Sequence, residues 1–141
     1  MATIEVQSKC APYSGPHVIR AAAVLTTSYV ASDILDGVEN FRALKLYTDF
    51  TKGSLTTVEL KIEFSHDGIS WYQEPSLSDS SGTITINLAE YQKNANLAIP
   101  LTFTNIAAKE IRVSVKGTGT VTGSSCTLTA VLFNSVSFSR F

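Results

Sequence analysis

The sequence contains few charged residues. Asp, Glu, Lys and Arg make up 16% of its 141 residues, whereas an ordinary soluble domain has ~25%. The net charge of −1 leaves no basic field that would attract nucleic acid or an anionic membrane. We therefore expect neither nucleic acid nor a membrane among the partners of this protein.

The sequence also has no segment that resembles an export signal or a membrane span. Residues 1–9 contain Glu5 and lack the apolar core of a secretory signal. The most apolar early run, residues 18–26, contains Arg20 and is far shorter than the ~20 residues that a membrane helix needs. We expect the protein to be made and used without Sec export.

Cysteine and histidine are scarce as well. The chain has two of each, and none lie at the spacing of metal ligands: Cys10, His17, His66 and Cys126. We therefore expect no zinc site, and we expect no cofactor. Two cysteines permit one disulfide, but we expect free thiols, as in a protein assembled inside a cell.

Three acids in one loop have side chains that could bind calcium: Asp33, Asp36 and Glu39. They do not follow the EF-hand pattern, so we interpret them as solvated loop residues. The residues alone leave calcium binding here as an open alternative.

What the chain does contain is alternation of apolar and polar side chains. In residues 57–64, Val58, Leu60, Ile62 and Phe64 alternate with polar neighbours, which predicts a strand with one dry and one wet face. Asp67 and Gly68 then predict a tight turn, after which Trp71 begins a return strand.

Similar alternation predicts a sheet protein along the whole chain. We expect further strands at residues 18–26, 44–50, 83–88, 97–103, 111–115 and 126–133. Breaks are expected at residues 11–16 and 117–123, where Pro and Gly gather, and Pro100 indicates an edge strand or a bulge.

The predicted fold is all-β, an antiparallel two-sheet β-sandwich of jelly-roll type with about eight strands. The sandwich is expected over residues 17–134, with an N-terminal arm at 1–16 and a C-terminal tail at 135–141.

Two patterns resemble catalytic sites. Ser65, His66 and Asp67 have the side chains of a hydrolase triad, but neighbouring residues in a strand and tight turn do not converge. Glu59 and Glu63 share a strand face, but roughly 13 Å separates them, beyond the ~5–9.5 Å of a glycosidase pair. We expect a hydrogen-bonded turn, an exposed charge ladder and no enzymatic activity, although a carboxylate on a neighbouring strand stays an open alternative for either glutamate.

Six aromatic residues could stack on a sugar: Tyr13, Tyr29, Tyr47, Trp71, Tyr72 and Tyr91. Trp71 and Tyr72 are the candidates that we single out. One of these two should point inward, and packing of Trp71 within the protein is the better interpretation.

Two stretches carry a resemblance to a known class of proteins. Leu46–Ser54 and Glu63–Glu74, with Val18–Thr26 before them, resemble auxiliary head or decoration-type proteins of tailed bacteriophages. Phe64–Trp71 is also similar, more weakly, to discoidin-like (galactose-binding-like) jelly rolls.

The resemblance implies a non-enzymatic structural protein of the virion, assembled in the host cytoplasm. Its expected role is that of a capsid decoration or cement protein that stabilises the head. Its expected partners are the major capsid protein and further copies of itself, for example in a trimer. The alternative, which we favour less, is a carbohydrate-binding β-sandwich module on a phage tail or neck appendage.

The termini supply the candidate interface residues. Both ends carry apolar side chains that would be exposed in a monomer: Ile4, Val6, Val136, Phe138 and Phe141. We expect one or both arms to pair with a neighbouring subunit or the capsid surface, the alternative being that the tail folds onto its own sandwich.

Overall fold

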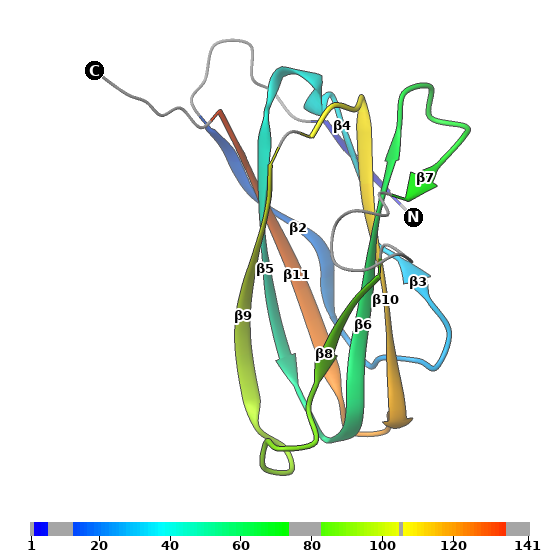
Figure 1. The fold of residues 1–141 in the computed structure, drawn as a ribbon, viewed down its shortest axis with the longest axis vertical. Helices are drawn as coiled ribbons and strands as arrows, with labels where there is room; N and C mark the ends of the chain where they lie inside the picture. The colour runs from blue at the N-terminus through cyan, green and yellow to red at the C-terminus, as the bar shows by residue number, and fades with distance from the viewer. Residues whose placement is uncertain (1, 6–12, 74–82, 105, 135–141) are drawn as a thin grey trace.

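The alternating segments form strands that assemble into two sheets packed face to face (Figure 1). The computed structural model describes residues 2–5, 13–73, 83–104 and 106–134. Within them lie β1 (Thr3–Glu5), β2 (Tyr13–Ala23), β3 (Val30–Ala31), β4 (Ile34–Asp36), the 3-10 turn η1 (Val38–Asn40), β5 (Ala43–Thr51), β6 (Ser54–Ser65), β7 (Tyr72–Gln73), β8 (Thr83–Asn87), β9 (Asn96–Thr104), β10 (Glu110–Thr120) and β11 (Ser125–Phe133). The chain is an all-β, two-sheet sandwich of jelly-roll type, as predicted.

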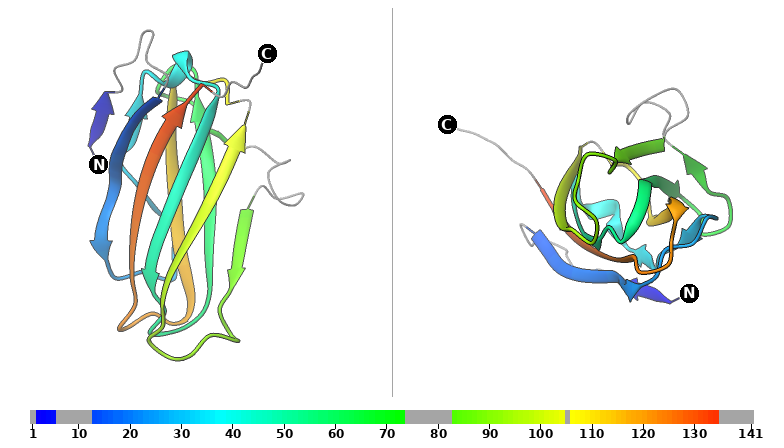
Figure 2. Two further views of the ribbon diagram at one scale, coloured as in Figure 1. Left: turned by 90° about the vertical axis from the view of Figure 1, so that its left-hand side faces the viewer. Right: turned by 90° about the horizontal axis from the view of Figure 1, so that it is seen from below.

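The two sheets differ in size. Sheet A has seven strands in the order β1-β4-β10-β6-β7, with β3 paired to β10 and β8 paired to β6. Sheet B has four strands in the order β2-β11-β5-β9. Every pair is antiparallel except β1 with β4. Figure 2 (left) looks onto the outer face of sheet B, where β2, β11, β5 and β9 lie side by side.

The core lies between the sheets and is built from the apolar phase of each strand. In sheet A, Leu60 of β6 lies opposite Val115 of β10, and all but 1% of each side chain is buried. In sheet B, Leu46 of β5 lies opposite Ala130 of β11, and both are fully buried. Burial of each large side chain contributes about 1.5–3 kcal/mol, so the strand faces hold the sandwich together.

The predicted edge position of residues 97–103 is confirmed. β9 is the last strand of sheet B, and Pro100 lies opposite Tyr47 of β5. An edge strand tolerates proline because one side of its backbone has no ladder to complete.

Two predicted breaks are wrong because strands continue through them. β2 begins at Tyr13 and contains Gly15 and Pro16, so residues 13–16 belong to the sheet. β2 is the edge of sheet B and its register with β11 is irregular, and at such positions a missing N–H is tolerated. β10 extends to Thr120 with a register shift at Thr118/Gly119, which shortens the loop predicted at 117–123.

The predicted N-terminal arm, residues 1–16, therefore includes β1 and the start of β2. Ile4 of β1 is half-buried and packs against the core of its own chain. Val6, Val136, Phe138 and Phe141, the other predicted interface residues, lie outside the described residues.

Candidate functional site

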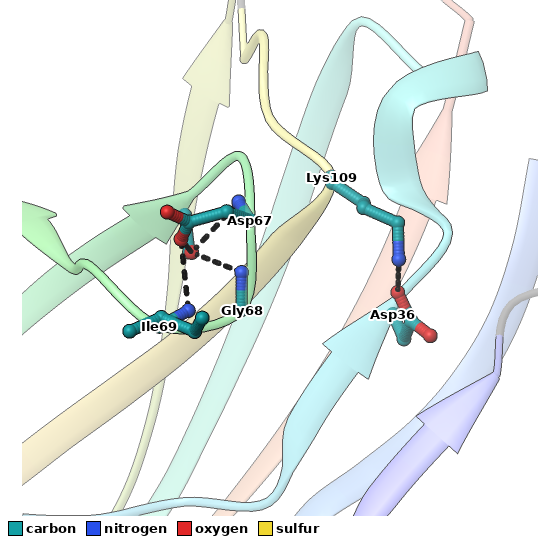
Figure 3. Close-up of polar contacts among 6 residues, drawn as sticks. Asp36, Asp67, Gly68, Ile69 and Lys109 are labelled. Carbon is teal, nitrogen blue, oxygen red and sulfur yellow. Dashed lines mark hydrogen bonds and ion pairs between the residues drawn. The ribbon is translucent and has the colours of Figure 1, made fainter.

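The Ser65–His66–Asp67 pattern forms the predicted hydrogen-bonded turn (Figure 3). The Ser65 hydroxyl accepts hydrogen bonds from the backbone N–H groups of Asp67 and Gly68, at 3.3 Å and 2.7 Å. Asp67 Oδ1 accepts from the N–H groups of Ile69 and Ser70, each at 2.8 Å. These backbone donors hold the pKa of Asp67 below its usual value. The serine and the aspartate are both used in building the turn, so they do not form a triad with His66.

Two of the three loop acids have hydrogen-bond partners within the protein. Asp36 accepts a bond from Lys109 Nζ at 3.2 Å, and Asp33 Oδ1 accepts from the backbone N–H of Ala2 at 3.1 Å (the Asp36 contact is in Figure 3). Burial, and then the nearby Asp36 carboxylate, raise the pKa of Glu110. Within the described residues, no group of three His, Cys, Asp or Glu side chains could hold a metal ion.

The predicted charge ladder is present on the outer face of sheet A. Glu63 of β6 accepts from Arg112 Nε of β10 at 2.9 Å, and Glu59 lies 3.9 Å from Lys116 Nζ. On β10 the neighbours of the two glutamates are these cations, and on the other side of β6 they are Gln73 and Thr85, so no second carboxylate lies directly opposite either glutamate. The ladder is half-buried, whereas an exposed one was expected.

Two aromatic rings cover this ladder. The Nζ atoms of Lys61 and Lys116 lie 4.5 Å and 5.0 Å from the centroid of the Tyr29 ring. Arg112 Cζ lies 4.3 Å from the centroid of the Trp71 ring. The cations are attracted to the electron-rich faces of the rings. The lysine and arginine charges of this surface therefore interact with other groups of the protein.

Trp71 and Tyr72 do not form a common stacking platform. Trp71 is half-buried against Arg112, whereas the exposed Tyr72 ring stacks on His66, with 6.1 Å between ring centroids. The two side chains contact different partners, and neither is buried in the core, although one was expected to point inward. Trp71 packs on Arg112 at the surface of sheet A.

A different aromatic residue lies open to solvent on the outer face of sheet B. Tyr47 of β5 is 42% exposed, and its neighbours across the ladders are Thr129 of β11 and Pro100 of β9. Asp49, the next residue on the same face, lies opposite Thr127 and Ala98. Along a strand, residues two apart are separated by about 6.8 Å, so Tyr47 and Asp49 are neighbouring positions on this face.

A depression of about 330 Å³ begins at Asp49 and extends to the end of the sheet. Its polar lining comes from three strands and consists of Asp49, Thr51, Asn96, Ser125 and Thr127. The Thr51 hydroxyl donates to Asn96 Oδ1 at 2.8 Å. This bond uses the amide oxygen of Asn96 and does not use its two N–H donors. Among the described side chains, none makes an ion pair or hydrogen bond with Asp49. We call Tyr47 and these five residues the Tyr47 surface.

β2 supplies a cation near this surface. Arg20 lies opposite Leu128 of β11, and its Nε and Nη2 groups donate to the carbonyls of Cys126, Ala23 and Val24 at 3.1–3.2 Å.

Cys126 is a free thiol in the core, and burial raises its pKa to about 11. Cys10 lies outside the described residues.

The sequence marked Tyr47 as one of six candidate stacking aromatics but did not single it out. The available signal was its position: Tyr47 is the aromatic residue on the polar phase of the 44–50 strand. The partners from β9 and β11 are about 50 and 80 residues away, and only the sheet register brings them to it.

Comparisons with known proteins show distant similarity of fold. The chain matches no protein-family model and no curated protein. Among solved structures it is similar to a non-crystalline-cellulose-specific carbohydrate-binding module, CBM28, with TM-score 0.48 and 10% identity over 92% of this chain and 79% of that one. A CBM4 structure gives TM-score 0.41 and 12% identity over 82% and 76%. These likenesses carry no inference about a ligand. The described residues also include no helix with the length and apolar character of a membrane span.

Proposed function

We propose that the chain is a non-catalytic glycan-binding β-sandwich that binds through the Tyr47 surface. The observation that carries the proposal is the exposed Tyr47 ring, which lies two residues along β5 from a depression with five polar lining residues on the same sheet. A sugar ring has an apolar face that packs on an aromatic ring and a rim of hydroxyls that need hydrogen-bond partners. The Tyr47 surface offers both kinds of contact within three neighbouring rows of one sheet.

The polar groups suit a ring of hydroxyls. Asp49 accepts hydrogen bonds, Asn96 donates and accepts, and the hydroxyls of Ser125 and Thr127 do either. Bonds to the Asp49 carboxylate are charge-assisted and stronger than neutral ones. A volume of about 330 Å³ lies at the lower end of the ~300–1,000 Å³ range of small-molecule sites. It suits a short stretch of glycan.

The backbone of the site is already ordered by its ladders. β5 lies between β11 and β9 and pairs with both along its whole length. Little conformational entropy is therefore lost from the backbone when a ligand binds. The absence of a water-activating constellation among the Tyr47 surface residues supports binding without chemistry.

The test is a glycan array followed by calorimetry with the purified protein. Tyr47→Ala should abolish glycan binding and leave the thermal unfolding midpoint nearly unchanged. Tyr91→Ala is the matched control, because Tyr91 is equally exposed (44%) and lies outside the depression. Trp71→Ala and Tyr72→Ala test the stacking pair singled out from the sequence. Loss of binding in those two variants, with Tyr47→Ala unaffected, would move the site to sheet A.

A second candidate function is attachment to another protein, as in a virion decoration protein. The observation in its favour is Ile69, which is 82% exposed at the tip of the turn built by Ser65 and Asp67. A rigid tip with an exposed apolar side chain is suited to insertion into a pocket of a partner. Co-sedimentation with assembled phage heads, lost in Ile69→Ser, would support this role over glycan binding.

A further inference from the structure

We infer that the Tyr47 surface selects uncharged or amino-bearing glycans and rejects anionic ones, through the carboxylate of Asp49. This inference rests on the proposed glycan-binding function and deepens it. The ligand class follows from the charges that sheet B places around the depression.

Sheet B carries very few charges. Its four strands contain three formally charged side chains: Arg20, Lys45 and Asp49. Asp49 is exposed, lines the depression and has no partner among the described side chains. It is therefore the charged group that a bound glycan meets directly.

Neither of the two cations lines the depression. Lys45 lies four residues from Asp49 on the same strand, with Tyr47 between them, so the two backbone positions are about 13 Å apart. Arg20 keeps its charge, but its Nε and Nη2 groups donate to three backbone carbonyls, and these bonds hold the guanidinium outside the lining of the depression.

An anionic sugar in the depression would therefore bring a second negative charge beside Asp49. Hydroxyl groups donate to the carboxylate, whereas a uronate, a sialate or a sulfate ester repels it. At contact distance near a protein surface, this repulsion corresponds to a loss in affinity of about tenfold or more. An ammonium group on the sugar would be attracted by the same charge.

The experiment compares pairs of related glycans that differ in charge. The probes are galacturonic acid oligosaccharides and their neutral methyl esters, sialylated and unsialylated galactosides, and chitin and chitosan oligosaccharides. In any pair that binds, the anionic member should bind at least about tenfold more weakly than the neutral one. Chitosan should bind at least as well as chitin, and added salt should reduce both differences.

Two variants assign the discrimination to a residue. Asp49→Asn keeps the shape of the side chain and should remove most of the gap, that is, the difference in affinity between neutral and anionic glycans. Glu90→Gln removes the same charge from an exposed position in the loop between β8 and β9, outside the depression, and should leave the gap unchanged. Unchanged thermal midpoints in both variants show that folding is not the cause.

The outcomes separate the inference from the function on which it rests. Equal or stronger binding of the anionic members overturns the inference and leaves glycan binding standing. A gap that Asp49→Asn does not reduce, or that Glu90→Gln reduces equally, also overturns it. If no probe binds, the proposed function fails, and the inference fails with it.

Discussion

The guanidinium of Arg112 lies over the ring of Trp71, with 4.3 Å between Cζ and the ring centroid. The same group donates from Nε to Glu63 Oε1 at 2.9 Å, and the two charged side chains are only 22% and 14% exposed. One side chain therefore joins β10, β6 and the segment before β7. This contact fastens the β6–β7 turn to the outer face of sheet A.

Removing Arg112 should destabilise the fold. Arg112→Met keeps most of the side-chain length but leaves the half-buried Glu63 carboxylate without its cation, with only the long bond from the Ser114 hydroxyl remaining. We expect the free energy of unfolding to fall by about 1–3 kcal/mol, measured by urea denaturation. Lys109→Met is the control, because it breaks a more exposed ion pair, with Asp36, and should cost much less. Equal losses of unfolding free energy in the two variants would mean that neither the Trp71 contact nor burial strengthens the Arg112–Glu63 ion pair.

The turn at Asp67 should make stability depend on pH. Its folded-state pKa is lowered by bonds from the backbone of Ser70 and Ile69, so the carboxylate stabilises the folded state above the unfolded-state pKa. That contribution is lost as the pH falls through the lower, folded-state pKa.

The measurement is a pair of thermal melting series, for the wild type and for Asp67→Asn. At neutral pH the wild type should melt at the higher temperature, because an amide oxygen is a weaker acceptor than a carboxylate. The difference should shrink below the usual pKa of an aspartate and vanish in strong acid. A difference that stays constant with pH would show that the ionised carboxylate contributes nothing to the turn.

Much of the fold could be predicted because alternation reports directly on which face of a strand is dry. The 57–64 strand shows this well: Val58, Leu60 and Ile62 are buried, as their phase predicts. The errors occur at sheet edges and irregular pairings. Pro16 lies within β2, an edge strand, and Gly119 follows a register shift in β10. Local composition alone cannot distinguish such positions from loops.

The candidate site was less predictable because it depends on pairing. Asp49, Asn96 and Ser125 are far apart in the sequence, and each appears there as an ordinary polar residue. Their approach follows from the register of β5 with β9 and β11, which a single sequence does not reveal. The turn at Ser65–Asp67, by contrast, uses contacts between near neighbours, and it was predicted correctly.

Cys126 should be unreactive in the folded protein. Its thiol lies in the core, and burial raises its pKa to about 11, so almost none is thiolate at pH 8. We expect iodoacetamide to leave the Cys126 peptide unmodified in native buffer and to modify it fully in denaturant, as read by peptide mass spectrometry. Rapid modification without denaturant would mean that the ends of β11 and β5 open readily.

Two glycines at one end of the sandwich should respond differently to the same substitution. Gly53 and Gly123 both adopt positive φ, of +57° and +85°, so alanine brings a conformational cost of roughly 1–2 kcal/mol at either position. The surroundings differ. A Cβ on Gly53 would lie 2.9 Å from the backbone carbon and oxygen of Gly123, whereas a Cβ on Gly123 would meet nothing within 4 Å.

Gly53→Ala should therefore lose more stability than Gly123→Ala, by about a further 1–3 kcal/mol, because backbone must move to relieve the contact. Urea denaturation of the two variants beside the wild type measures the difference. Since Gly53 follows β5 and Gly123 precedes β11, the same displacement should widen the end of the depression between Thr51 and Ser125. Equal losses in the two variants would show that the β5–β6 and β10–β11 turns are not packed against each other as described, and that this end of the Tyr47 surface is more open.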